Sequence, residues 1–339
     1  MHMEHDEFQP VRWGVLGVSG HYRLRVHNPM DDLENEGVVE RIAIASRELE
    51  RAKEAARQLG FRKAYGSYED LLADPEVEAV YIPLPNTMHA EYVKKAADAG
   101  KHILCEKPFT MSAKETEEAI QYALEKEVLV MEAFMYRLHP QWQHAKRLVS
   151  AGEIGEVQNI HVFFSYHNPD PSNIRNRKEL GGGAIPDIGC YAVSSSRFLM
   201  GREPERVVAL VRRDPELEVD TLSSGILDFG GPRALFTVGT RTFPRQEVQV
   251  YGSRGYLSIE IPFNMYPDVP AKLTVQTSVG TRVVETEAID QYGLEFTAFS
   301  LAVRGEMPLP IPPEDAIANQ KVLDALFRSE ESGTWEKVT

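Results

Sequence analysis

The fold of this chain is decided near its beginning, by the run Val11-Arg12-Trp13-Gly14-Val15-Leu16-Gly17-Val18-Ser19-Gly20. Its apolar residues predict a β-strand over residues 11–18, and its glycines predict a tight turn at the end of that strand. Glycine at such a turn lets backbone amides approach a pyrophosphate, as in the dinucleotide-binding pattern G-x-G-x-x-G. Gly17 fits the first position of that pattern, but Ser19 and Tyr22 stand at the other two. The run alone therefore fits an ordinary strand–helix turn as well as a nucleotide site.

Strands and helices alternate over about the first 135 residues. Predicted strands then lie at residues 41–45, 79–83, 102–105 and 128–131, and predicted helices at 48–59, 90–99 and 112–126. Gly60 and Gly100 end two of these helices, and Ser112 with Glu115 forms a capping box at the start of the third. Strands that alternate with helices indicate βαβ units and therefore a parallel sheet.

The pattern changes after Gly155. Predicted strands follow one another at residues 157–166, 206–212, 221–229, 233–240, 247–252 and 256–261, with predicted helices at 184–200, 291–305 and 314–332. Because few helices intervene between the strands, we expect a largely antiparallel sheet. The fold class is therefore α/β in the first part of the chain and α+β in the second, with the boundary between Met135 and Gly155.

The composition indicates a globular protein of about two domains, since 339 residues exceed one ordinary core and 42% of them are hydrophobic. A net charge of −14 repels phosphate backbones, so we expect no nucleic-acid partner. Two cysteines, Cys105 and Cys190, fit a reducing compartment better than a disulfide framework. No apolar run approaches the ~18 residues of a membrane span, and residues 1–10 lack the pattern of a signal peptide. We therefore expect a cytoplasmic protein that does not bind membranes.

The end of the second predicted strand, Ile44-Ala45-Ser46-Arg47, bears on the choice of nucleotide. An NAD-preferring fold usually has Asp or Glu here to hold the ribose 2′-hydroxyl, whereas arginine suits the 2′-phosphate of NADP. Ser46 can donate a hydroxyl hydrogen bond and Arg47 a bidentate contact. Arg47 also fits a solvated residue of the first helical turn, and the neighbouring Glu48 favours NAD. We predict NADP, with NAD as the alternative.

A lysine follows another predicted strand, in the run Leu104-Cys105-Glu106-Lys107-Pro108. Ligands of open α/β sheets bind beyond the carboxyl ends of the strands, so Lys107 can meet a substrate there. A lone lysine at such a place is more often an ordinary surface residue. The remaining motifs of the chain decide between these two interpretations.

Five stretches of the sequence resemble motifs of one known family. They are residues 13–20, Tyr81-Ile82-Pro83-Leu84-Pro85-Asn86-Thr87-Met88-His89, Cys105-Glu106-Lys107-Pro108, Glu132-Ala133-Phe134-Met135-Tyr136-Arg137-Leu138-His139-Pro140 and Gly181-Gly182-Gly183-Ala184-Ile185-Pro186-Asp187-Ile188-Gly189-Cys190-Tyr191. With them, nearly the whole chain resembles the glucose–fructose oxidoreductase / inositol dehydrogenase / MocA (Gfo/Idh/MocA) family. Within that family, the chain is most similar to the NADP-dependent D-xylose dehydrogenases and dihydrodiol dehydrogenases.

The resemblance implies an NAD(P)-binding Rossmann domain at residues 10–140. It implies a substrate-binding and oligomerisation α+β domain, with a large open sheet, at residues 141–339. It also implies catalytic roles for Lys107, Asp187 and Tyr191, the last of which stands where many members have histidine. Asp187 and Tyr191 are four residues apart and so share one face of the predicted helix.

Further residues are candidates for contact with ligands. The candidate cofactor residues are Gly17, Ser19, Gly20, His21, Ser46, Arg47, Pro83, Leu84, Asn86, His89, Glu106 and Lys107. Tyr136, Arg137 and His139 lie at the expected domain junction and are candidate walls of the substrate pocket. Arg175 belongs to a small basic cluster that fits either a substrate contact or a solvated loop. No ligand spacing suggests a metal site.

Two features depart from the family pattern. Tyr22 stands where a small residue usually lets the helix pack on the strand, and residues 23–30 fit an amphipathic helix poorly. We expect either that the turn is locally remodelled or that the cofactor is bound through somewhat different contacts.

The implied reaction is hydride transfer between NADP(H) and a CH–OH group of a sugar, polyol or related diol. Free tyrosine and lysine have pKa values near ~10 and ~10.4, so neither is a ready base at neutral pH. We expect the lysine ammonium and the positive nicotinamide ring to favour tyrosinate, which makes Tyr191 the base and Lys107 its partner, although the roles can be exchanged. Asp187 would orient the substrate hydroxyl or the lysine. The alternatives are a keto-sugar reductase running in the opposite direction and a non-catalytic nucleotide- or sugar-binding regulator on the same fold.

Some predicted strands of the second sheet are too continuously apolar for a sheet with one wet face. Examples are Val207-Val208-Ala209-Leu210-Val211 and Ala234-Leu235-Phe236-Thr237-Val238. Monomers rarely expose an apolar face of that size. We therefore expect a homodimer or a dimer of dimers packed sheet to sheet, as is common in the family.

Overall fold

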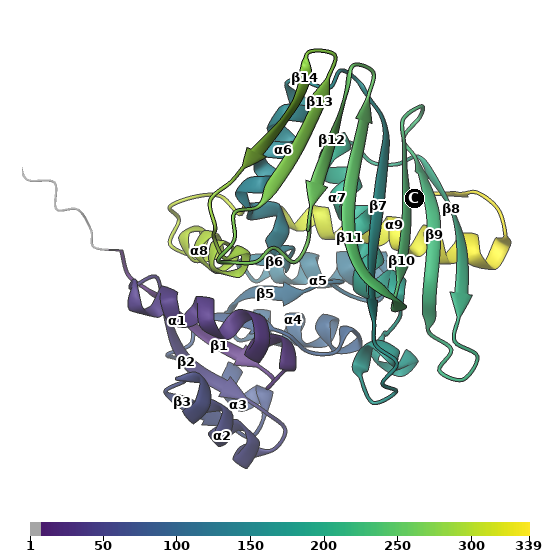
Figure 1. The fold of residues 1–339 in the computed structure, drawn as a ribbon. Helices are drawn as coiled ribbons and strands as arrows, with labels where there is room; N and C mark the ends of the chain where they lie inside the picture. Colours follow the sequence, from purple (N-terminus) through teal and green to yellow (C-terminus); the bar gives the residue numbers. More distant parts are fainter. Residues whose placement is uncertain (1–7) are drawn as a thin grey trace, which may run out of the picture.

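The computed structural model describes residues 8–339, which form two sheets with helices packed around them (Figure 1). The expectation about a signal peptide rests on residues 1–10, most of which lie outside the described residues. Within residues 8–339, no helix is both long enough and apolar enough to cross a bilayer.

The first sheet has six parallel strands in the spatial order β3-β2-β1-β4-β5-β6. They are β1 (Val11–Leu16), β2 (Val39–Ala45), β3 (Lys63–Tyr65), β4 (Ala79–Ile82), β5 (His102–Glu106) and β6 (Val130–Ala133). This is the strand order of the doubly wound nucleotide-binding fold. From β1 to β3 the chain adds strands towards one edge of the sheet, and from β4 to β6 it adds them towards the other, so the topological switch point lies between β1 and β4. The predicted parallel sheet is confirmed, and its ligand site is expected beyond the carboxyl ends of these two strands.

Short loops join these strands to the helices that cover the sheet. The helices are α1 (His27–Asn35), α2 (Leu49–Leu59), α3 (Tyr68–Leu72), α4 (His89–Asp98) and α5 (Ala113–Glu125). As predicted, α2 ends at Gly60, which has a φ of 74°, and the hydroxyl oxygen of Ser112 accepts a hydrogen bond from the N–H of Glu115 at the start of α5. β3 and α3 were not predicted because three and five residues are too few to show a hydrophobic period.

The segment after the glycine-rich turn is not a regular first helix. Residues Tyr22–Val26 form a π-helical turn that leads into α1. Tyr22 is fully buried, and its ring lies 5.7 Å from that of Phe61 and 6.3 Å from that of Tyr81. A π-turn widens the backbone, which gives a tyrosine room where a small residue is usual. The turn is therefore remodelled locally around Tyr22.

The second sheet has nine strands in the order β14-β13-β12-β11-β7-β10-β9-β8-β15. They are β7 (Val157–His167), β8 (Arg206–Arg213), β9 (Asp220–Asp228), β10 (Arg233–Gly239), β11 (Arg241–Gly252), β12 (Gly255–Glu260), β13 (Lys272–Thr277), β14 (Gly280–Glu285) and β15 (Glu336–Lys337). Each neighbouring pair is antiparallel except β10 with β7, so the predicted, mostly antiparallel sheet is confirmed.

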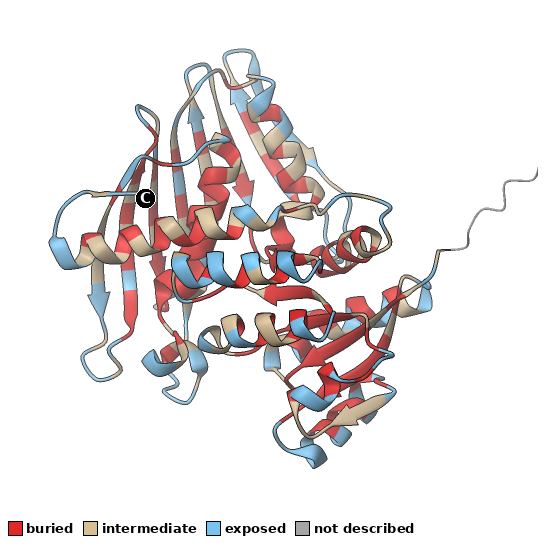
Figure 2. Cartoon of the chain, turned by 180° about the vertical axis from the view of Figure 1, so that it is seen from behind, coloured by how far each residue is buried: buried red, intermediate tan, exposed pale blue. Residues whose placement is uncertain are grey.

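Helices cover one face of the second sheet (Figures 1 and 2). They are α6 (Pro140–Ser150), α7 (Cys190–Met200) and α9 (Pro313–Ser332). Among the described residues, no helix lies on the opposite face, which forms a shallow groove. This open face presents Phe163, Ile226, Leu235 and Leu210, and the side chain of Leu210 is 80% exposed.

The last part of the chain returns to the first sheet. Trp13 of β1 packs against Phe296 and Phe299 of α8 (Gln291–Val303), with ring centroids 4.9 and 5.5 Å away. The indole N–H of Trp13 donates to the hydroxyl of Ser300 at 3.2 Å. α9 also packs on α5. These contacts join the two sheets into one body around the site.

Candidate active site and cofactor cleft

An open cleft of about 1220 Å³ lies beyond the carboxyl ends of β1, β2, β4 and β5. Loops of the first sheet form one wall, and β7, β11 and residues 172–182 contribute to the other. The cleft therefore lies at the place where doubly wound sheets bind their ligands.

The glycine-rich turn forms one end of the cleft. Gly17 has a φ of 109°, a left-handed conformation that side chains rarely adopt, and its N–H donates to the carbonyl of Ala45 at 3.0 Å. A Cβ on Gly17 would also press on Leu84 at 3.1 Å. The hydroxyl of Ser19 accepts from the N–H of Tyr22 at 3.0 Å. The cleft lining here includes Gly17, Ser19, Gly20 and His21.

Two arginines and a serine lie beside this turn. Ser46 is buried, Arg47 is exposed, and both line the cleft. Arg51, which was not predicted, also lines the cleft and donates to the carbonyl of Val18 at 3.0 Å. Arg47 precedes α2 and Arg51 lies in its first turn, so only their nearness in the sequence could have identified Arg51.

The loop after β4 brings Pro83, Leu84 and Asn86 to the cleft. The predicted contact from His89 is corrected, because its ring is fully buried behind this loop and does not line the cleft. The ring nitrogens of His89 lie 2.8 Å from the carbonyl of Leu84 and 3.0 Å from that of Pro108. His89 therefore ties the loop after β4 to the segment that follows Lys107.

Lys107 and Asp187 meet at the centre of the cleft. Nζ of Lys107 donates to the backbone carbonyl of Asp187 at 2.6 Å and to its Oδ1 at 3.2 Å. Nε of Arg175 lies 3.1 Å from both carboxylate oxygens of Asp187, and the hydroxyl of Tyr166 donates to Oδ2 at 2.7 Å. Tyr166 was not predicted.

These contacts set the charges at the centre. Burial favours the neutral lysine and so lowers its pKa. The charge of the Asp187 carboxylate has the opposite effect and outweighs burial, so the pKa of Lys107 is raised. Burial likewise opposes ionisation of Asp187, but Arg175 and Lys107 outweigh it and lower the pKa of that carboxyl. The site therefore holds an ammonium and a carboxylate at neutral pH.

Glu106, next to Lys107, faces the glycine-rich turn. Its Oε1 accepts a hydrogen bond from the hydroxyl of Tyr81 at 2.6 Å and lies 3.3 Å from Nε2 of His21. Burial opposes the charge of Glu106, but His21 and Lys107 outweigh it and lower the pKa to about 2. Glu106 is thus an anchored carboxylate between the glycine-rich turn and Lys107.

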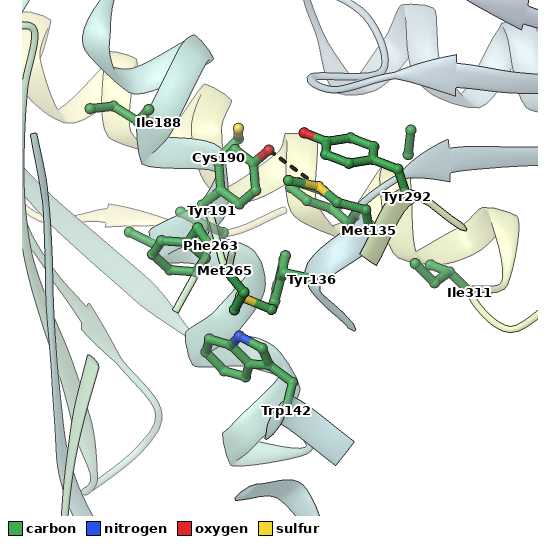
Figure 3. Packing of buried hydrophobic residues seen from close by; sticks show 14 of the residues in the cluster. Met135, Tyr136, Trp142, Ile188, Cys190, Tyr191, Phe263, Met265, Tyr292 and Ile311 are labelled. Atoms are coloured by element: carbon green, nitrogen blue, oxygen red, sulfur yellow. Dashed lines mark hydrogen bonds between the residues drawn. The ribbon is translucent and has the colours of Figure 1, made fainter. Parts of the chain in front are cut away.

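Tyr191 lines the cleft among aromatic rings. Nζ of Lys107 lies 4.9 Å from the centre of the Tyr191 ring, and the hydroxyl of Tyr191 donates to Sδ of Met135 at 3.6 Å (Figure 3). Burial and the nearby Tyr292 and Glu106 raise the pKa of Tyr191 well above its usual value. The surrounding protein groups therefore favour the neutral phenol, and the effect of the positive nicotinamide ring on Tyr191 stays a prediction.

The predicted substrate residues divide into two groups. Arg175 lines the cleft. Tyr136, Arg137 and His139 do not, which corrects the expectation that they form pocket walls. The hydroxyl of Tyr136 bonds that of Ser194 at 2.7 Å, Arg137 pairs with Asp315 at 2.7 Å, and His139 caps α6. The chain turns inward after β6, so these side chains pack between elements.

The glycine run before Asp187 allows a close approach of segments. The carbonyl of Gly181 accepts from the side-chain amide of Asn86 at 2.9 Å, which joins the two walls of the cleft. A Cβ on Gly182 would collide with the backbone of Arg175. The run therefore lets the loop that carries Arg175 pack tightly beside the site.

The doubly wound sheet, the cleft at its switch point and the charged lysine–aspartate pair define the class of nicotinamide-dependent oxidoreductases. The family model described as "Oxidoreductase family, NAD-binding Rossmann fold" matches residues 11–134, and the "GFO/IDH/MocA C-terminal domain" matches residues 142–258. The chain belongs to the Gfo/Idh/MocA family of oxidoreductases.

Several relatives match over nearly the whole chain. A D-xylose 1-dehydrogenase (NADP(+)) of Haloferax volcanii is 41% identical over 95% of this chain and 98% of its own. A dTDP-3,4-didehydro-2,6-dideoxy-alpha-D-glucose 3-reductase of Actinomadura kijaniata is 31% identical over 94% of this chain and 95% of its own. The crystal structure of a 3-ketoreductase from Actinomadura kijaniata, in complex with NADP and TDP-benzene, superposes with a TM-score of 0.88 at 31% identity, covering 95% of this chain and 98% of that one.

Proposed function

We propose that this protein is an NADP-dependent dehydrogenase that transfers hydride between the cofactor and a CH–OH group of a sugar, polyol or related diol. The observation that carries the proposal is the Lys107–Asp187 pair, which lies in the same cleft as the glycine-rich turn. The dehydrogenase relative from Haloferax volcanii acts on D-xylose with NADP(+) by its name. A non-catalytic regulator would not need a charged lysine held at the centre of the cleft.

The nucleotide end of the cleft fits NADP. Arg47 and Arg51 line it beside the buried Ser46, and the residue after the end of β2 is not acidic. We assign the 2′-phosphate to these three residues and the pyrophosphate to the turn at residues 17–20. When bound, the cofactor accepts or supplies the hydride.

Lys107 is assigned to the substrate oxygen. An ammonium has three N–H donors. Two of them are used in hydrogen bonds to the backbone carbonyl and the carboxylate of Asp187. The third donor is left for the oxygen of the reacting CH–OH or C=O group. Tyr191 is assigned to proton exchange with that oxygen, and Tyr166 holds Asp187 in place.

The reverse reaction, reduction of a keto-sugar, is a second candidate. Both Lys107 and Tyr191 have raised pKa values, Lys107 because Asp187 outweighs its burial and Tyr191 because of burial. Both groups therefore hold protons that a carbonyl oxygen could receive when it is reduced. The Actinomadura kijaniata relative is a reductase of a sugar nucleotide by its name.

We also propose a homodimer, or a dimer of dimers, packed through the open face of the second sheet. That face presents apolar side chains, including Phe163, Ile226 and Leu235. A cytoplasmic location is proposed because Cys105 and Cys190 are free thiols.

The function is tested by steady-state assays of aldoses, polyols and diols with NADP+ or NAD+, and of keto-sugars with NADPH or NADH. We expect turnover with at least one of these substrate classes and a higher kcat/KM with the phosphorylated cofactor. Tight binding of NADP without turnover of any class would instead support the regulator.

A further inference from the structure

The helix that carries Asp187 and Tyr191 begins against a buried carboxylate. This helix starts with the π-helical turn Ile185–Gly189 and continues as α7. The first N–H groups of a helix have no acceptor within the helix. The N–H of Ile185 instead donates to Oδ2 of Asp220, at 2.7 Å.

Asp220 is held firmly in this position. It is the first residue of β9 and is only 1% exposed. The hydroxyl of Ser223 donates to the same Oδ2 at 3.0 Å. Burial raises the pKa of Asp220 to about 6, so the group is largely the carboxylate at neutral pH. A carboxylate at a helix N-terminus is also favoured by the helix dipole.

The third glycine of the run before this helix leaves room for Asp220. Gly183 has a φ of 133°, and a Cβ there would collide with Oδ1 of Asp220. The carbonyl of Gly183 accepts from the N–H of Asp187 at 3.1 Å. Gly183 and Asp220 therefore fit together at the start of the turn that carries Asp187.

Asp220 does not line the cleft, so it can act on the reaction only through another residue. Asp187 follows Ile185 by two residues in the same turn. Its carboxylate and its backbone carbonyl both accept hydrogen bonds from Nζ of Lys107. A shift of this turn would move both acceptors of the lysine together.

We infer that Asp220 is a positioning residue, which holds the first turn of the helix so that Asp187 meets Lys107. The inference rests on the proposed function for its catalytic readout. Misplacement of about 1 Å at a reacting centre costs roughly a hundredfold in rate, so a contact outside the cleft can matter for turnover.

The test compares three variants. Asp220→Ala removes the acceptor of the Ile185 N–H, whereas Asp220→Asn keeps an oxygen in its place. Asp228→Ala is the matched control, because Asp228 lies at the other end of β9, outside the cleft, and accepts from Arg206 at 2.9 Å. Both alanine variants remove a hydrogen-bonded carboxylate from the same strand.

We expect Asp220→Ala to lower kcat by about ten- to a hundredfold with KM for NADP(H) unchanged, and Asp220→Asn to restore kcat to within about threefold of wild type. Asp228→Ala should leave kcat unchanged, even if its melting temperature falls by as much as that of Asp220→Ala. Equal kcat in the two alanine variants, or loss of NADP(H) binding in Asp220→Ala, would overturn the inference.

Hydrogen exchange gives a readout that does not depend on turnover. Asp220→Ala should speed amide exchange in residues 184–191, and Asp228→Ala should not. If Asp220→Ala does not fold, Ser223→Ala provides a milder change, with the same peptide expected to exchange faster. A wild-type protein without turnover would reject the proposed function, whereas unchanged exchange at residues 184–191 would reject the positioning role.

Discussion

The hydroxyl of Tyr166 donates a hydrogen bond of 2.7 Å to Oδ2 of Asp187. The other oxygen of that carboxylate accepts from Nζ of Lys107 at 3.2 Å, so one carboxylate joins the tyrosine to the lysine. Tyr191 instead directs its hydroxyl to the sulfur of Met135. Two tyrosines in the cleft are thus candidates to support proton transfer, one through Asp187 and one directly.

Replacing Tyr166 or Tyr191 by phenylalanine distinguishes support of proton transfer through Asp187 from direct proton transfer. Tyr166→Phe leaves Asp187 paired with Lys107 and Arg175, so we expect kcat to fall by about tenfold, the usual weight of one hydrogen bond to a charged group. Tyr191→Phe should lower kcat by ~10²–10⁴ if its hydroxyl exchanges the proton. Steady-state assays of both variants decide the matter. A larger loss in Tyr166→Phe would transfer the proton role to that residue.

Replacing Lys107 should lower turnover strongly and change cofactor binding little. Lys107→Met removes the ammonium that Asp187 holds, and we expect kcat to fall by ~10²–10⁴. Lys107→Arg keeps the charge beside Asp187 but places a planar fork where a single Nζ stood, so most of the turnover should still be lost. Calorimetry should show NADP binding within about threefold of wild type in both. Wild-type turnover in Lys107→Met would refute the central assignment.

The choice of nucleotide is tested at Arg47, which precedes α2. Arg47→Asp places a negative charge at the proposed 2′-phosphate site, and we expect the Kd for NADP to rise at least about tenfold more than the Kd for NAD. Arg57→Asp is the control, because Arg57 is an exposed arginine of α2, the helix that follows Arg47, and it lies outside the cleft. Equal weakening of both cofactors by Arg47→Asp, or tighter binding of NAD than NADP by the wild type, would contradict the assignment.

Much of the fold could be predicted because it follows from local patterns. The helix predicted at residues 184–200 agrees with the described one, since its apolar residues and the terminal Gly201 lie within one segment. β13 and β14 were missed because each has six residues and only two of them are apolar, which is too few to show a period, and β14 is mostly exposed.

The site could be predicted only where a motif carries the chemistry. Lys107 and Asp187 belong to two motifs, and the structure brings them together. Tyr166 and Asp220 belong to neither, and their places depend on how β7 and β9 pair within the sheet. Tyr136 shows the opposite error, because a polar residue near a motif can also be buried against a neighbouring helix.

Glu132 makes stability depend on pH. It is buried, its Oε1 accepts from the N–H of Phe109 at 2.9 Å, and its Oε2 has no partner among the described residues. Burial, with a smaller contribution from Asp315, raises the pKa of Glu132 from 4.5 to about 8. The folded state therefore holds this proton more tightly than the unfolded state. The stability that it contributes is fully present below pH 4.5 and is lost as the pH rises through about 8.

Glu132→Gln removes this titration, because the amide keeps an oxygen for Phe109 and carries no charge. The variant should gain stability over wild type on going from pH 5 to pH 8, by on the order of a few kcal/mol. Urea unfolding at the two pH values measures the difference. A stability gap between variant and wild type that does not change with pH would show that Glu132 is not protonated in the folded protein.

The open face of the second sheet predicts the assembly. Leu210 is 80% exposed at the edge of the groove that Phe163, Ile226 and Leu235 line, and such a face is costly to leave in water. In a two-fold dimer packed sheet to sheet, Leu210→Glu would place two carboxylates in an apolar interface, and burying unpaired charges is strongly unfavourable. We expect light scattering to show a dimer or tetramer for the wild type and a smaller species for Leu210→Glu. Val279→Glu is the control, because Val279 is 96% exposed at the β13–β14 turn, away from the groove. A wild-type monomer at micromolar concentration, or the same mass in all three proteins, would mean that this face does not join subunits.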